Sequence, residues 1–170
     1  NLSLNDALQI LQLQRRLLTS FPGNVRWAFK HFPLDMHGQA MGAARAALAA
    51  QAQGKFWEFH DRLFFDQRRI SPEHFTELAR TLGLDMATFE RALQGDALEK
   101  VVRLDMEVGR RLGVQGTPSF FINGRKVDGG TPYSQLEKIV DTVEQRVQER
   151  PEHELETVEI GKIMISELRP

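Results

Sequence analysis

Side chains that could carry out covalent or acid–base chemistry are sparse in this sequence. It contains no cysteine, which excludes disulfides, thiolate catalysis and cysteine-ligated metals. The five histidines are dispersed without the spacing of a metal site, so no metal is expected. His37 could act as an acid or base, but its place just before an alanine-rich segment also fits a helix start. Neither Gly-x-Gly-x-x-Gly nor a Walker sequence is present, and no cofactor is expected.

The most informative local pattern is Gly116-Thr117-Pro118, followed by the apolar run Ser119–Ile122 and the turn Asn123-Gly124. The proline favours extended backbone at Thr117. Asn-Gly after a short apolar run is a strong hairpin signal, so residues 125–128 are expected to return as a second strand. Thr117–Pro118 is a candidate cis peptide, although most X-Pro bonds in folded proteins are trans.

Composition limits the classes of function. With 170 residues the chain is long enough for one domain with a sizeable core, or for one domain with an elaboration. Its net charge of −1 gives no electrostatic reason to expect nucleic acid or a membrane surface as a partner. No apolar run approaches the roughly 20 residues that span a bilayer, so no membrane insertion is expected. No signal peptide is visible at Asn1, and without an initiator methionine the sequence is expected to be a mature form or an excised fragment.

Periodicity predicts a helix, a strand, a block of helices, a β-hairpin and a final helix. The first helix is expected to end near Ser20, and Val25–Phe32 has the composition of a strand buried on both faces. The final helix is expected to begin at Thr131-Pro132 and end at Arg150. About five helices are expected in the block, with caps at Ser71, Asp85 and Asp96, a closely packed alanine-rich segment at 39–53, and a last helix whose face contains Leu98, Val101, Leu104 or Asp105, Val108 and Leu112.

Three segments together resemble the DsbA-like branch of the thioredoxin superfamily. They run from Phe-Pro-Gly-Asn at 21–24 to His-Phe-Pro-Leu at 31–34, from Phe-Trp-Glu-Phe-His-Asp at 56–61 to Leu-Phe at 63–64, and over Gly-Val-Gln-Gly-Thr-Pro-Ser-Phe-Phe-Ile-Asn-Gly at 113–124. The resemblance covers about residues 4–148. It implies an α/β, thioredoxin-like fold with a core of residues 1–37 and 115–150 and an all-helical insertion at 38–114. It also implies an extracytoplasmic location, periplasmic or secreted, and a cis proline that faces a Cys-x-x-Cys pair.

The sequence departs from this family at two points. Counting back from Pro22-Gly23, the redox pair falls at Leu4 and Ala7, and neither side chain supplies a thiolate. The family also has a strand just before the redox helix, in the centre of the sheet, and this first core strand is missing. Because a gap there would leave backbone groups unpaired at a cost of about 1–3 kcal/mol each, another segment is expected to fill it.

The C-terminal tail, residues 151–170, contains a candidate replacement. Residues 157–166 have strand composition, with Val158 and Ile160 alternating before Gly161 and a second alternation after it. Two interpretations stay open. The segment is an edge strand or a linker to another domain, or it fills the central position, in its own chain or swapped from a neighbour in a homodimer.

Two functions are compatible with these features. The first is a redox-inactive module that binds an extended peptide or protein segment through the backbone of Gly116, Thr117 and Pro118, as the resemblance to thioredoxin-like folds implies. The second is a fragment or degenerate repeat of a thiol-disulfide oxidoreductase that keeps the family's fold without its activity. A purely structural or dimerising role is a third.

Overall fold

The computed structural model describes residues 11–12, 14–16, 18–19, 25–122, 124–127, 138, 141–142, 145 and 158–163. The chain divides into two compact units. The sheet unit comprises Asn1–Phe29 and Pro118–Met164, and the helical unit comprises Lys30–Thr117 and Ile165–Pro170. None of the helices in the described part of the chain combines the length and the apolar character that crossing a membrane requires.

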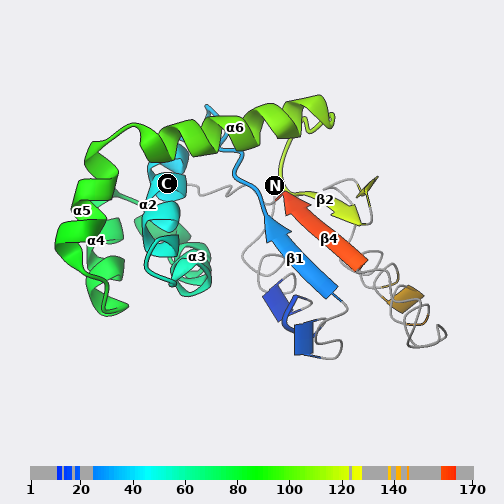
Figure 1. The fold of residues 1–170 in the computed structure, drawn as a ribbon, viewed down its shortest axis with the longest axis horizontal. Helices are drawn as coiled ribbons and strands as arrows, with labels where there is room; N and C mark the ends of the chain where they lie inside the picture. Colours follow the sequence, from blue (N-terminus) through cyan, green and yellow to red (C-terminus); the bar gives the residue numbers. More distant parts are fainter. Residues whose placement is uncertain are drawn as a thin grey trace. The chain divides into compact units, whose positions relative to one another are not determined.

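The sheet unit contains a four-stranded mixed sheet. Its strands are β1 (Val25–Phe29), β2 (Ser119–Ile122), β3 (Arg125–Val127) and β4 (Val158–Ile163), in the order β1-β4-β2-β3. β4 is parallel to β1 and antiparallel to β2, so the C-terminal strand lies in the centre of the sheet (Figure 1). The prediction that the tail fills the central position of its own chain is therefore confirmed, and the interpretation of the tail as an edge strand or a linker is wrong.

The register of β4 explains why this segment fits between its neighbours. Ile160 lies opposite Trp27 of β1, and Glu159 lies opposite Arg26. β-branched residues fit the pleated surface of a sheet, and the tail brings this composition to the position next to β1.

β1 is shorter and less buried than its composition indicated. It ends at Phe29 rather than at Phe32. Trp27 and Phe29 are only half-buried and alternate with exposed neighbours, so the expected burial on both faces was wrong. Two residues after the end of the strand, the amide of His31 donates a hydrogen bond to a carboxylate oxygen of Asp105 at 3.0 Å, so the backbone there is bonded within the helical unit rather than to a strand.

The β2–β3 hairpin forms where Asn123-Gly124 predicted it. Phe120 pairs with Val127, and Ile122 pairs with Arg125 across the turn. Gly124 has a φ of +75°, a backbone conformation that favours glycine. The hairpin gives β2 a partner on one edge, while β4 pairs with the other edge.

A core of alanine and aromatic side chains organises the helical unit. Seven alanines of α2 are buried, which lets neighbouring helices approach its backbone closely, as predicted for the alanine-rich segment. The rings of Phe59 and Phe89 are fully buried, with centroids 5.9 Å apart. In the described part of this unit the α-helices are α2 (Ala40–Gln51), α3 (Phe56–Phe65), α4 (Pro72–Thr81), α5 (Met86–Gln94) and α6 (Ala97–Arg111).

Two of the three predicted helix caps form. Ser71 Oγ and Asp85 Oδ1 each accept a hydrogen bond from the backbone amide three residues further on, at 3.2 Å and 2.7 Å. Asp96 precedes α6 but makes no side-chain capping bond. Its carboxylate instead lies 2.8 Å from the Lys100 ammonium, one turn along the same helix.

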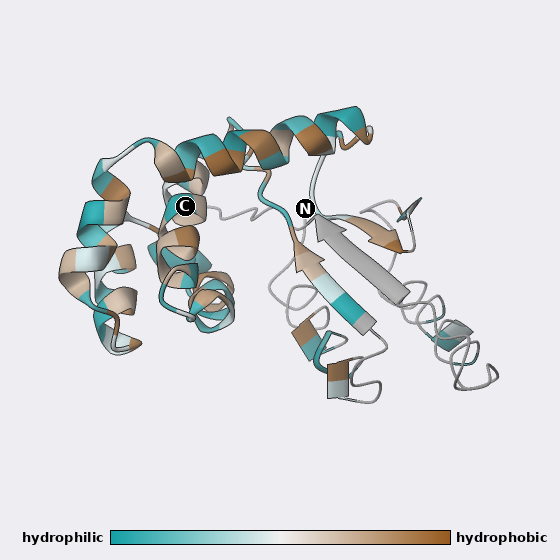
Figure 2. Cartoon of the chain, in the orientation of Figure 1, coloured by the Kyte–Doolittle hydropathy of each residue, from teal (hydrophilic) through white to brown (hydrophobic). Residues whose placement is uncertain are grey.

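The buried face of α6 differs from the predicted one. Of the two predicted alternatives, Asp105 is buried and Leu104 is 60% exposed, and Gly109, which was not predicted, also lies on the buried face. Gly109 is required there because a Cβ would come within 2.7 Å of the Phe32 ring. Figure 2 shows hydrophobic and hydrophilic residues alternating along α6. A prediction from apolar character alone therefore placed large apolar residues on the buried face that are exposed in the structure. The four large apolar residues of α6 that are exposed are Val101, Leu104, Val108 and Leu112.

Deletion of residues 155–170 tests the central placement of β4. We expect the truncated chain to lose cooperative unfolding of the sheet, because β1 and β2 would each keep a row of unpaired backbone groups at about 1–3 kcal/mol per buried group. Thermal unfolding followed by far-UV circular dichroism measures this. A shorter deletion of residues 167–170 leaves β4 intact and serves as the control. Unchanged stability of the longer deletion would contradict the central placement.

Candidate functional site

The candidate site is the loop between α6 and β2. Gly113 ends α6 with a φ of +74°, and its amide donates a hydrogen bond to the Arg110 carbonyl at 3.0 Å. From there the chain runs through Gly116 and Thr117, both half-buried, to the buried Pro118. Because β2 begins at the next residue, the rigid sheet holds one end of the loop.

The loop has an open side. A Cβ added at Gly116 would meet no heavy atom of the described residues within 4 Å, and the φ of Gly116 lies outside the left-handed region. Glycine is therefore not required there by backbone strain. Its neighbour Thr117 has a buried hydroxyl with no hydrogen-bond partner among the described residues. A buried polar atom without a partner among the described residues calls for a specific explanation.

The predicted neighbours of this loop lie outside the described residues. Leu4 and Ala7, at the positions of the family's redox pair, are not among the residues whose structure is described. The predicted cis Thr117–Pro118 bond and its closeness to Leu4–Ala7 therefore stay predictions. Ser119, for which no base partner was expected, is buried and pairs with Ile163 of β4.

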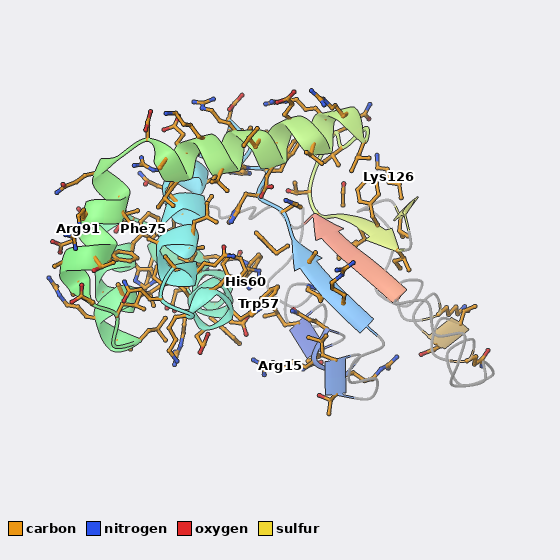
Figure 3. The ribbon with its side chains drawn as sticks, viewed as in Figure 1. Arg15, Trp57, His60, Phe75, Arg91 and Lys126 are labelled. Atoms are coloured by element: carbon orange, nitrogen blue, oxygen red, sulfur yellow. The ribbon has the colours of Figure 1, made fainter. Side chains whose placement is uncertain are left out.

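A second group of chemically capable side chains lies buried in the helical unit. His31 and His60 are only 6% and 3% exposed, and the ring of Phe56 lies between them at 5.9 Å and 5.7 Å. Trp57 packs edge-on against His60, and both project from α3 (Figure 3). His60 Nδ1 lies 3.0 Å from a carboxylate oxygen of Asp61. His60 is thus a packed residue of the helical core.

Burial sets the protonation of His31. Desolvation lowers the pKa of His31 from 6.5 to about 4, and the nearby negative charge of Asp105 opposes this shift only in part. Asp105 also accepts a hydrogen bond from the Lys30 ammonium at 2.7 Å. His31 is therefore neutral at physiological pH and suits a structural position better than acid–base catalysis there.

The other histidines of the described part of the chain do not form a metal centre. No group of three histidine or acidic side chains among the described residues could hold a metal ion. His37 lies in the turn before α2, where its carbonyl accepts a hydrogen bond from the Ala40 amide at 3.0 Å. That position agrees with the helix-start interpretation of His37.

Comparison with known protein families identifies the family of this chain. The model of the DSBA-like thioredoxin domain matches residues 7–141, and the chain belongs to this family. The matched region contains β1, helices α2 to α6 and the β2–β3 hairpin, and it ends before β4.

Solved structures agree with this assignment. A thioredoxin-like oxidoreductase from Silicibacter pomeroyi is 30% identical, with a TM-score of 0.68 over 85% of this chain and 82% of that protein. The thiol-disulfide exchange protein alpha-DsbA2 from Wolbachia pipientis is 25% identical, with a TM-score of 0.66 over 79% of this chain and 71% of that protein. The predicted fold, a DsbA-like thioredoxin fold rich in helices with a small sheet, is confirmed.

The curated relatives are named as Na(+)/H(+) antiporters rather than as oxidoreductases. The Na(+)/H(+) antiporter NhaA 1 of Salinispora arenicola is 40% identical over 116 residues, which is 68% of this chain and 18% of the antiporter. The chain thus spans about a fifth of the length of the curated relatives it matches.

The low pKa of His31 predicts acid sensitivity. The folded state binds the His31 proton only near pH 4, whereas the unfolded chain binds it near pH 6.5. The stabilisation from neutral His31 is therefore complete above pH 6.5 and is lost as the pH falls to about 4, by about 3 kcal/mol in total. Urea unfolding of the wild type and of His31→Gln at pH 7 and pH 4 measures this. The difference between the two chains isolates His31 from acids that titrate in the same range. Equal pH dependence in both chains would contradict the burial argument.

Proposed function

We propose that this chain is a redox-inactive, DsbA-like domain that binds an extended peptide or protein segment. The observation that carries the proposal is the loop Gly116–Pro118, which leads directly into the inner strand β2 and in which a Cβ at Gly116 would meet no described residue within 4 Å, in a chain without cysteine. Backbone next to a strand end can pair with an extended peptide, and neighbouring side chains then select the ligand.

Each residue of the loop has a distinct part in this proposal. Pro118 restricts its predecessor to extended backbone, so Thr117 offers its peptide groups in a strand-like arrangement. The unpaired hydroxyl of Thr117 can accept or donate a hydrogen bond to the ligand. The missing Cβ of Gly116 leaves room for the ligand backbone.

The longer relatives indicate the setting in which such a domain would work. We place it as one part of a longer polypeptide related to the antiporters, since those proteins match this chain over about a fifth of their length. By family resemblance, the proposed location is extracytoplasmic.

A second copy of the chain is the other partner to which the sequence points. β4 follows the other described strands along the chain, so two copies could exchange it and form a homodimer without any new interface. In such a dimer each sheet would keep the order β1-β4-β2-β3 with β4 supplied by the neighbour.

The absence of thiols gives the first test. We expect the purified chain to reduce insulin disulfides no faster than buffer, because no residue can form the mixed disulfide through which thiol exchange proceeds. Turbidity of insulin in dithiothreitol measures the rate. As a control, Leu4→Cys with Ala7→Cys restores the pair at the family positions. Sustained turnover by the wild type would contradict redox inactivity.

Peptide binding gives the second test. A fluorescent library of random ten-residue peptides yields the strongest binder, whose affinity is then measured by anisotropy. We expect Pro118→Ala to weaken that binding by about tenfold, or about 1.4 kcal/mol, because alanine no longer restrains Thr117. Pro72→Ala, at the first position of α4, is the matched control and should leave the affinity unchanged. If no peptide binds, or if both variants bind equally, the proposal is wrong.

A further inference from the structure

Four large apolar side chains of α6 are exposed and follow one another along the helix. Val101, Leu104, Val108 and Leu112 are 42%, 60%, 43% and 50% exposed. Their spacing of three, four and four residues places them in one row, because residues three and four apart lie on the same face of a helix. At 1.5 Å per residue the row is about 16 Å long. We call these four residues the α6 stripe.

The α6 stripe ends beside the candidate loop, within the helical unit. The amide of Val114 donates a hydrogen bond to the Gly109 carbonyl at 2.9 Å, so the chain beyond α6 is held against the last turn of the helix. Gly116 follows two residues later, a reach of at most about 7 Å. The same end of the helix carries Leu112, the last residue of the stripe. The loop therefore begins where the stripe ends.

Charged side chains of α6 near the stripe are paired with one another. Each pair joins a basic side chain to an acidic one a turn earlier on the helix, namely Lys100 with Asp96, Arg103 with Glu99 and Arg111 with Glu107. The Arg110 guanidinium lies over the Phe32 ring, 5.8 Å from its centroid. Because the three ion pairs balance, they offer a ligand no excess of either charge, and the stripe selects apolar side chains.

An extended segment fits the α6 stripe better than a second copy of the chain does. Side chains on one side of an extended peptide repeat about every 6.6 Å, close to the roughly 6 Å between residues four apart on a helix. A segment of about five residues therefore spans the whole stripe. A standard protein interface uses about 20–30 residues a side, many more than the four residues of the stripe.

We propose that the α6 stripe is the part of the peptide site that selects the side chains of the ligand. One extended segment pairs with the backbone of Gly116 and Thr117 and continues along α6. There its large apolar side chains, at alternate positions, contact Leu112, Val108 and Leu104. The ligand class is thus an extended polypeptide segment with alternating large apolar residues. The inference rests on the proposed peptide binding at the loop and adds the chemical class of the ligand.

Two fluorescein-labelled ten-residue peptides test the inference on the full chain. In the apolar probe leucine alternates with serine, and in the polar probe threonine replaces every leucine. We expect the apolar probe to bind at least tenfold more tightly by anisotropy, and Leu104→Gln with Val108→Gln to remove this advantage. Glutamine is a good helix former, so α6 stays folded. Phe65→Gln, at an exposed apolar residue of α3, is the matched control and should leave both affinities unchanged.

Pro118→Ala separates this inference from the proposed function. It should weaken both probes by the same factor, because it acts at the loop, whereas the α6 variant weakens only the apolar probe. If both probes bind the wild type equally and Pro118→Ala weakens both, peptide binding at the loop stands and the inference is wrong. If neither probe binds, both are wrong. An apolar probe that responds to the α6 variant but not to Pro118→Ala occupies a separate site and also overturns the inference.

Salt dependence and sedimentation identify other occupants of the stripe. The affinity of the apolar probe should change less than twofold between about 50 mM and about 500 mM NaCl, because the neighbouring charges are already paired. A large loss of affinity at high salt would show ionic recognition and overturn the apolar ligand class. The α6 variant should not change the sedimentation of the chain. A dimer that dissociates in this variant would assign the stripe to a second copy and overturn the peptide assignment.

Discussion

The sheet depends on two rows of backbone hydrogen-bonding groups, one on β1 and one on β2, that need a strand between them. Neither strand pairs with the other, and β4 bonds to both. Buried peptide groups left without partners cost about 1–3 kcal/mol each. The summed cost of two unpaired rows would therefore exceed the free energy of unfolding of a small domain. This demand explains why a segment outside the family-matching region, 7–141, is part of the sheet.

The same constraint reaches the candidate site. Ser119 and Phe120, the first residues of β2, pair with Ile163 and Lys162 of β4. Pro118 and Thr117 come directly before them, so the strand that completes the sheet also holds the end of the candidate peptide-binding loop. In the helical unit, Asp105 has a comparable part, since its carboxylate binds both the Lys30 ammonium and the His31 amide where the chain leaves β1.

Features with local causes could be predicted from the sequence, and features with distant causes could not. The Asn-Gly hairpin, the caps at Ser71 and Asp85 and the packing of the alanine-rich helix depend on neighbouring residues and were predicted correctly. The buried face of α6 was predicted only in part: Asp105 was one of two alternatives, and Gly109 was missed because it is selected by Phe32, about 75 residues earlier in the chain. The early end of β1 was likewise missed, since the amide of His31 bonds to the distant Asp105. His31 and His60 lie in separate segments of the sequence, so their proximity could not be predicted. Only the fold brings His31 near Phe56 and His60.

The placement of β4 is the central claim, and native-state hydrogen exchange of the intact chain measures it most directly. Amides of Val158–Ile163 should exchange with the same opening free energy as those of β1 and β2, because all three strands open together when the central strand leaves. Protected amides in β1 and β2 beside unprotected amides in 158–163 would contradict the account.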